Sequence, residues 1–234
     1  MKDKYSMSLE ENIFVAKKLL ISNIYNSARV EGCNVTFPQT QTILDGVNVA
    51  DVTLDDIQTI LNLRNAWKFM LSTITSEFNL EYVCRLNDDI SRGESLAWGK
   101  LRTGQVGISG TDYIPDIPDY DTTDRELSSI LISERYSCTE KAIKIFLYVT
   151  RHQLFWDGNK RTATLCANKI LIKEGKGIFT IPDKHILEFN ERLLEYYNTN
   201  DESKIFGFLF ECCIDGMPDR QNQKHPDIRK GTSR

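Results

Sequence analysis

Apolar side chains recur at helical spacing over most of this 234-residue chain, which is the pattern of amphipathic helices. The first apolar stripe consists of Ile13, Phe14, Leu20, Ile21 and Ile24. It predicts one helix from about Leu9 to Arg29 with its apolar side buried. Ser8 and Glu11 stand at the spacing of a capping box, so we expect them to begin this helix.

The same periodicity predicts further helices along the chain, over residues 38–44, 54–74, 80–90, 182–197 and 203–213. Two more helices, one within 127–150 and one over 162–173, flank a short polar segment. Gly175 and Gly177 follow the second of these and are expected to end it. The pattern therefore predicts a mostly helical protein.

The helical period breaks between Ser91 and Tyr120. Glycines separate short apolar pieces in this segment, at positions 93, 99, 104, 107 and 110. Such punctuation predicts a small β-hairpin or an extended flap, and a plain surface loop would have the same composition.

The segment HQLFWDGNKR, residues 152–161, is the most chemically specific part of the chain. Its DGNKR portion lies between two predicted helices and ends at the start of the second, where unpaired N–H groups and the helix dipole attract anions. Lys160 and Arg161 add full positive charges, and Asp157 can supply an oxygen ligand to Mg²⁺. These residues predict a di- or triphosphate site, and a turn with solvated charges is the open alternative.

The same segment resembles the signature of the Fic family, H-x-F-x-[DE]-G-N-[GK]-R. The matching residues are Phe155, Asp157, Gly158, Asn159, Lys160 and Arg161. Upstream, Ser27, Glu31 and Gly32 are similar to the inhibitory motif of this family, [ST]-x-x-x-E-[GN]. The resemblance covers roughly residues 8–213 and implies an all-α, Fic-type helical bundle with a small β-hairpin flap.

The resemblance implies transfer of a nucleotide monophosphate, usually AMP from ATP with magnesium, to a hydroxyl side chain of a target protein. Asp157 would then hold the metal and Arg161 would grip a phosphate. The remaining matched residues of the nucleotide site would be Phe155, Gly158, Asn159 and Lys160. The target segment would dock at the flap, at about residues 99–118, by pairing with an edge strand.

The upstream match implies inhibition by the first helix. Glu31 would pair with a cation of the anion loop, above all Arg161, and keep the resting protein weakly active. Ser27, one helical turn earlier, would hold the Glu31 carboxylate by a hydrogen bond, with Gly32 completing the motif.

The chain departs from the Fic pattern at the catalytic histidine, whose position is occupied by Gln153. A glutamine side chain has no titratable group near neutral pH and cannot act as a general base. His152 is a candidate substitute, but it lies one residue early and projects about 100° away on a helix, so a helix-end role is favoured. Thr164 stands where many family members have a further arginine.

Three functions therefore remain open. The protein can be an adenylyltransferase with weak or altered activity, a nucleotide-binding pseudoenzyme that binds proteins at its flap, or a kinase-like phosphotransferase. The third is suggested by Lys160, because a family member with the N-K-R form transfers the γ-phosphate.

Composition and charge indicate which partners and which cellular compartment to expect. The net charge is −4 and no basic stripe compensates it, which argues against nucleic-acid binding. No signal peptide or membrane span is visible, and six cysteines without C-x-x-C spacing suggest free thiols, so we expect a cytoplasmic, bacterial protein. A homo-oligomer is compatible with the sequence.

The expected organisation has three parts. Residues 1–35 would form the inhibitory helix region and residues 36–214 the Fic core. Residues 215–234 are polar, carry two prolines and lack apolar periodicity, so they are expected to be a flexible tail.

Overall fold

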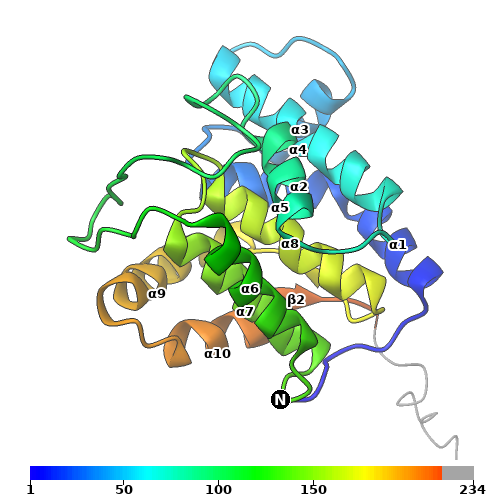
Figure 1. Cartoon of the computed structure of the whole chain (residues 1–234). Helices are drawn as coiled ribbons and strands as arrows, with labels where there is room; N and C mark the ends of the chain where they lie inside the picture. The colour runs from blue at the N-terminus through cyan, green and yellow to red at the C-terminus, as the bar shows by residue number, and fades with distance from the viewer. Residues whose placement is uncertain (218–234) are drawn as a thin grey trace, which may run out of the picture.

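Figure 1 shows a computed structural model of the chain, which describes residues 1–217. The described residues form ten α-helices, one 3₁₀ turn and one small antiparallel sheet, so the predicted all-α class is confirmed. The helices are α1 (Leu9–Lys18), α2 (Leu20–Val30), α3 (Phe37–Leu44), α4 (Leu54–Ser72), α5 (Leu80–Ile90), α6 (Tyr120–Ile132), α7 (Cys138–His152), α8 (Asn159–Lys173), α9 (Ile186–Thr199) and α10 (Ser203–Cys212). The strands β1 (Ile178–Phe179) and β2 (Ile214–Asp215) pair with each other, and the turn η1 (Asp183–His185) precedes α9.

Helix α8 is the centre of the fold. Every residue from Arg161 to Ile172 is buried, and a helix buried on all sides must be surrounded by other elements. Helix α7 packs along it, and α1, α4, α5 and β1 contact its other sides (Figure 1). The short connection between α7 and α8 therefore presents residues 153–158 at one end of the core.

The predicted single helix from Leu9 to Arg29 is two helices in the structure. At Leu19 the backbone leaves helical geometry, with φ −93° and ψ 6°. The break lets α1 pack on α8 and β1 while α2 packs on α3 and α4. No proline or glycine marks this position, so the break follows from tertiary packing and has no local signal. The capping box of Ser8 and Glu11 is present as expected.

Between α5 and α6 a β-hairpin, an extended flap or a plain loop was possible, and the hairpin is not formed. Within residues 1–217 the only strands are β1 and β2, and residues 91–119 make an extended excursion instead (Figure 1). The predicted start of the tail at residue 215 is too early, because Asp215 belongs to β2 and pairs with Ile178. The rest of the expected tail, residues 218–234, lies outside the described residues.

No helix within residues 1–217 is long and apolar enough to cross a membrane. All six cysteines are free thiols, as the sequence suggests. Cys33, Cys166 and Cys213 are buried, and burial raises the pKa of the Cys33 thiol to about 12. That thiol is therefore protonated and unreactive at neutral pH.

Lys169 is a charged side chain within the buried face of α8. Its Nζ donates to the carbonyls of Thr73 (2.5 Å) and Ile74 (2.8 Å) just after α4, where the helix dipole is negative. Burial, with a smaller effect of the Lys173 charge, lowers the Lys169 pKa to about 8 from 10.5. The unfolded chain therefore binds more protons than the folded chain between these two values.

We expect the free energy of unfolding to rise as the pH increases from about 8 to about 10.5, because the unfavourable burial of the Lys169 charge disappears in that window. Urea denaturation at several pH values measures this slope. Lys169→Met should reduce the slope relative to the native chain. An equal slope in both proteins would show that other groups produce it.

Candidate active site

The loop between α7 and α8 is shaped by two residues with left-handed backbone. Gln153 has φ 45° and ends α7, and Gly158 has φ 71° and begins α8. A Cβ atom at position 158 would lie 2.4 Å from Ser91 Oγ and 2.7 Å from Ile90 Cγ2. Glycine is therefore required at 158 both by its backbone conformation and by the close approach of α5.

Side-chain hydrogen bonds hold the loop from both sides. The carbonyl of Asp157 accepts from Asn87 Nδ2 (3.0 Å) and Ser91 Oγ (2.9 Å) at the end of α5. Inside the loop, Asn159 Oδ1 accepts from the N–H of Phe155 and its Nδ2 donates to the Phe155 carbonyl, both at 2.9 Å. The first N–H groups of α8 are left without helical partners and open toward the loop.

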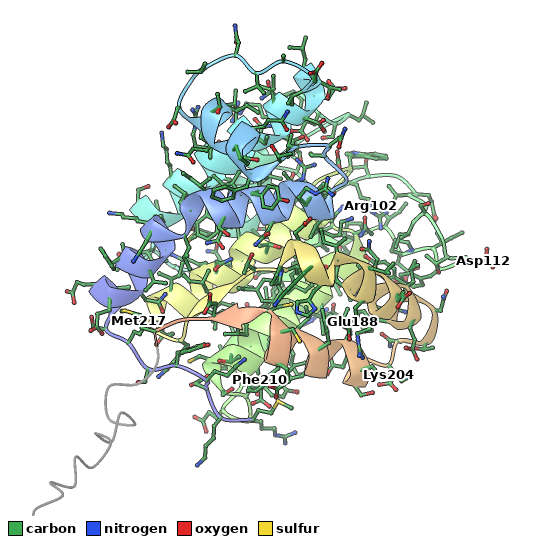
Figure 2. All side chains as sticks on the ribbon, turned by 180° about the vertical axis from the view of Figure 1, so that it is seen from behind. Arg102, Asp112, Glu188, Lys204, Phe210 and Met217 are labelled. Atoms are coloured by element: carbon green, nitrogen blue, oxygen red, sulfur yellow. The ribbon has the colours of Figure 1, made fainter. Side chains whose placement is uncertain are left out.

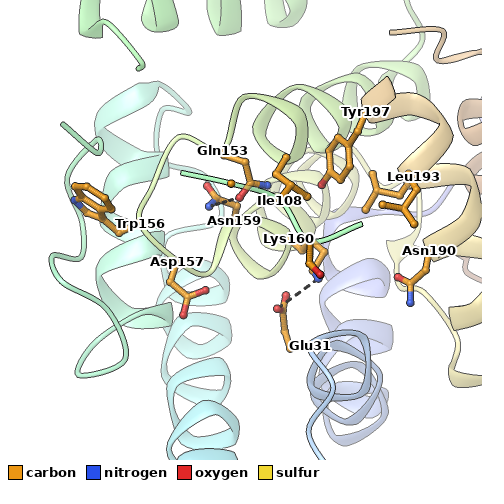
Figure 3. Close-up of a pocket in the computed structure, with 13 residues that line it drawn as sticks. Glu31, Ile108, Gln153, Trp156, Asp157, Asn159, Lys160, Asn190, Leu193 and Tyr197 are labelled. Carbon is orange, nitrogen blue, oxygen red and sulfur yellow. Dashed lines mark hydrogen bonds and ion pairs between the residues drawn. The ribbon is translucent and has the colours of Figure 1, made fainter. Parts of the chain in front are cut away.

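A cavity of about 410 Å³ opens over this loop (Figure 3). It is lined by Glu31, Gly107, Ile108, Ser109, Gln153, Trp156, Asp157, Asn159, Lys160, Asn190, Leu193, Leu194 and Tyr197. The structure thus brings five residues of the segment 152–161 together with the upstream glutamate. The other walls come from the extended segment and from α9.

Gln153 lies on the wall of this cavity, at the position of the family histidine. Its Nε2 donates to the Thr150 carbonyl at 2.6 Å and its Oε1 accepts from Asn159 Nδ2 at 3.1 Å. The amide is thereby fixed in one orientation, as Figure 3 shows. It offers hydrogen bonds to a bound molecule and no proton acceptor for a general base.

His152 does not reach the site. Its ring stacks on Tyr148 at 4.1 Å between centroids, and Nδ1 lies 2.9 Å from the Tyr148 carbonyl. It lines a different cavity, of about 430 Å³, on the other side of α7. The role of substitute base is therefore not supported. His152 is the last residue of α7 and its ring contacts the preceding helical turn, which is the favoured helix-end position.

Phe155 and Arg161 also differ from the expected nucleotide contacts. Phe155 is fully buried in the hydrophobic core, where it anchors the loop, and it does not line the cavity. The Arg161 side chain is only 4% exposed and is likewise absent from the cavity wall. Both residues are buried behind the cavity wall and support the loop that forms it. Lys160, which lies on the wall, is 29% exposed.

The Glu31 carboxylate lies between the two cations, as the upstream motif suggests. Its oxygens are 3.7 Å from Lys160 Nζ and 3.9 Å from Arg161 Nε (Figure 3 marks the Lys160 pair). Oε1 is buried and accepts no hydrogen bond from the described residues. The expected hydrogen bond from the Ser27 side chain is not formed. Instead the Ser27 carbonyl accepts from the Glu31 N–H at 3.3 Å, as part of the helix end. Gly32 follows with φ 87° and terminates α2.

A second carboxylate, which the sequence did not indicate, binds Arg161 more closely. Glu94 Oε2 accepts from Arg161 Nη1 at 2.6 Å. Asp157 Oδ2 lies 3.5 Å from Arg161 Nη2. Burial alone would lower the pKa of Arg161, but the three carboxylates Glu31, Glu94 and Asp157 raise it above its usual value. Glu94 sits in the irregular segment after α5, so no periodicity or motif could have revealed it.

The Asp157 carboxylate is suited to a single-residue contact with Mg²⁺. Its side chain is 46% exposed and lines the cavity, and Oδ1 accepts from the Gly158 N–H at 2.6 Å. Residues 1–217 contain no cluster of three or more acidic, histidine or cysteine ligands. A magnesium ion here would therefore take its other ligands from phosphate and water, which is its common mode in nucleotide sites.

The extended segment is held over the cavity by one buried arginine. Arg102 is 1% exposed and donates to five carbonyls, those of Gly104, Pro115, Asp116, His152 and Gln153. Residue 104 and residues 115–116 of this segment are thus joined to each other and to the end of α7. Figure 2 shows Arg102 at the base of the segment and Asp112 at its outer end. This clamp replaces the strand pairing expected for a hairpin.

Helix α9 supplies cavity residues that the sequence placed only in a helix. Asn190, Leu193, Leu194 and Tyr197 recur at helical spacing and face the cavity together. Burial, with the Glu31 charge as a smaller cause, raises the pKa of Tyr197. The same spacing is typical of a core face, so it could not distinguish a cavity wall from the interior. Trp156, another cavity residue, lies within the motif. Its ring packs so closely on Gly104 that a Cβ atom at position 104 would lie 2.6 Å from the ring.

Comparison with known proteins finds relatives of this chain. Residues 77–171 match the Fic/DOC family model. The chain is 25% identical over 205 residues to the protein adenylyltransferase Fic of Drosophila erecta, and 25% identical over 206 residues to that of Aedes aegypti. Each alignment covers 84% of this chain. The chain spans about two-fifths of the length of these relatives, 41% and 40%.

Solved structures show the same fold. Fic-1 (residues 134–508) of C. elegans superimposes with a TM-score of 0.73 at 19% identity, over 83% of this chain and 60% of that one. A Fic domain-containing signalling protein of Bacteroides thetaiotaomicron gives 0.71 at 18% identity, over 87% and 85%. The part of the chain that matches the Fic/DOC family model includes α7, most of α8 and the loop between them.

Proposed function

We propose that this protein binds ATP with magnesium in the cavity over α8 and transfers AMP to a hydroxyl side chain of a target protein, with cleavage of the bond between the α- and β-phosphates and release of pyrophosphate. The observation that carries the proposal is the convergence of Asp157, Lys160 and the open N-terminus of α8 on one cavity beside Gln153. The adenylyltransferase relatives favour AMP as the transferred group.

The residues of the loop would act mainly by positioning. The N–H groups at the start of α8 and the Lys160 ammonium would receive the phosphates, and Asp157 would hold the magnesium ion, which neutralises phosphate charge. Trp156 and the α9 residues would enclose the rest of the nucleotide and exclude water. In phosphate chemistry, orientation and charge stabilisation can supply much of the rate without a strong base.

Gln153 would make the native enzyme slow. Its amide can orient an attacking hydroxyl, but the attacking oxygen must lose its proton to water or to the phosphate. A missing general base typically costs about 10²–10⁴-fold in rate. The native chain would therefore work far below the rate of a histidine-containing homologue.

The target protein would dock at the segment of residues 99–118. The cavity is lined by Gly107, Ile108 and Ser109 of this segment, so a docked target would lie beside the nucleotide. An extended segment without internal strand pairing has N–H and C=O groups available for a bound peptide, which supports recognition through backbone hydrogen bonds.

ATP labelled separately at the α- and γ-phosphate tests this function. With purified protein and a panel of candidate targets, AMP transfer labels protein from the α-position only. Label from the γ-position alone would instead establish the kinase-like reaction. Saturable ATP binding with no label from either position would identify a pseudoenzyme.

Inhibition by Glu31 gives a further prediction. Three carboxylates, Glu31, Glu94 and Asp157, surround two cations, so the resting site carries excess negative charge that opposes a triphosphate. Glu31→Gln should strengthen ATP binding about tenfold, since a like charge is removed next to both cations. Glu31→Gly should act in the same direction.

Calorimetry measures this affinity, with Glu10→Gln as the control because Glu10 is an exposed residue of α1 and the charge change is equal. Equal ATP affinity in Glu31→Gln and the native chain, with both folded, would make Glu31 a structural carboxylate.

A further inference from the structure

The buried side chain of Arg161 is held by hydrogen bonds to the end of α5 and to the segment that follows it. Its Nη1 donates to Glu94 Oε2 at 2.6 Å and to the Ile90 carbonyl at 3.3 Å. The side chain is 4% exposed and does not line the cavity. Breaking one partner out of a buried ion pair is strongly unfavourable, because the other charge is left without compensation. Arg161 is therefore poorly placed to turn toward a nucleotide.

Glu94 is itself held in position by α4. Asn62 Nδ2 donates to Glu94 Oε1 at 2.7 Å, and the same amide donates to the carbonyls of Ile90 (3.2 Å) and Arg92 (2.9 Å). Gln58 Nε2 in turn donates to Asn62 Oδ1 at 2.8 Å. This chain of contacts fixes the Glu94 carboxylate where it meets Arg161.

The free side of the Arg161 guanidinium faces the site carboxylates. Nη2 lies 3.5 Å from Asp157 Oδ2, on the residue suited to hold magnesium. Nε is buried, donates to none of the described residues, and lies 3.9 Å from Glu31 Oε1. A guanidinium fixed at one end by Glu94 thus orients Asp157 at its other end.

Lys160 has the opposite environment. Its ammonium lies on the cavity wall and is 29% exposed. Its one ion-pair contact in the described chain is Glu31, at 3.7 Å, which is longer than a hydrogen bond. Lys160 can therefore exchange Glu31 for a phosphate at little cost.

We propose that Lys160 is the residue that contacts phosphate in this chain, and that Arg161, fixed by Glu94, is a positioning residue that orients the Asp157 carboxylate. The inference rests on the proposed nucleotide cavity but not on AMP transfer. It assigns different roles to two adjacent cations that the signature alone does not distinguish.

The test uses calorimetry with inorganic tripolyphosphate as the probe, with and without Mg²⁺, on the full chain. Lys160→Gln should weaken metal-free binding by about tenfold or more, the value of a lost charge-assisted hydrogen bond. Lys173→Gln is the matched control and should stay within about twofold, because Lys173 is exposed and roughly 20 Å further along α8.

Arg161→Lys keeps the charge but loses the fork that spans Glu94 and Asp157. It should leave metal-free affinity within about twofold and reduce the gain on adding Mg²⁺. Glu94→Gln releases the arginine charge, so metal-free affinity should rise by about threefold or more. A purely structural role for Glu94 would lower that affinity or leave it unchanged. Thermal denaturation checks that each variant is folded. If Glu94→Gln does not fold, the metal-free affinities of Arg161→Lys and Lys160→Gln are compared to test the proposal.

Two results would overturn the proposal. One is a loss of metal-free binding in Arg161→Lys as large as in Lys160→Gln, which would place Arg161 on the phosphate. The other is no tripolyphosphate binding by the native chain. Binding that depends on Lys160, together with no transfer from α-labelled ATP, would contradict AMP transfer and leave the assignment of the two cations intact.

Discussion

Gln153→His should raise AMP transfer by about 10²–10⁴-fold over the native chain, because it introduces a general base at the cavity wall. The backbone of residue 153 is left-handed, with φ 45°, and histidine is among the residues enriched in that conformation. The substitution is therefore compatible with the observed loop. Initial rates of labelling from α-labelled ATP, at equal protein concentration, measure the effect.

The control for this experiment is His152→Ala, made in both the native and the Gln153→His background. His152 points into the cavity on the other side of α7, so we expect no change in rate. Equal rates for the native chain and Gln153→His would mean that deprotonation does not limit the reaction. A large loss on His152→Ala in the native background would show that the ring moves into the site.

Arg102→Ala should lower the free energy of unfolding by about 3–5 kcal/mol and release the extended segment. Five carbonyls lose their common donor, and a buried acceptor left without a partner costs about 1–3 kcal/mol. Water can reach part of the opened segment, so the loss of stability should be smaller than the sum of the costs for five unpaired carbonyls. Urea denaturation measures the stability, and the rate of proteolysis within residues 103–116 measures the release of the segment.

Two further variants make this test specific. Arg135→Ala removes an exposed arginine and should change stability by less than about 0.5 kcal/mol. Arg102→Lys keeps the charge, but a lysine cannot donate in the planar fork that spans both ends of the segment, so most of the loss should remain. Native-like proteolysis of Arg102→Ala would show that contacts with α9, such as Thr111 to Asn198, hold the segment instead.

Local signals account for much of the secondary structure. The predicted helix over 80–90 coincides with α5, whose apolar residues recur at helical spacing on one face and whose start is capped by Asn79. The helix over 203–213 differs from α10 by one residue. By contrast, the break at Leu19 and the absence of a hairpin in 91–119 depend on contacts from distant parts of the chain. The residues that make those contacts are far apart in the sequence, so no local pattern could predict them.

The order of residue types in HQLFWDGNKR determined by itself that a polar loop stands at the start of a helix, and it predicts that this loop binds anions. Turn residues, the helix dipole and charge are local properties. The sequence also determined that the position of the family histidine carries no base. Only the tertiary structure decided which side chains reach the cavity. It turned His152 away, buried Phe155 and bound Arg161 to Glu94 while Lys160 stayed on the wall. These outcomes depend on burial and on partners from α4, α5 and the segment after α5, which come together only when the chain folds.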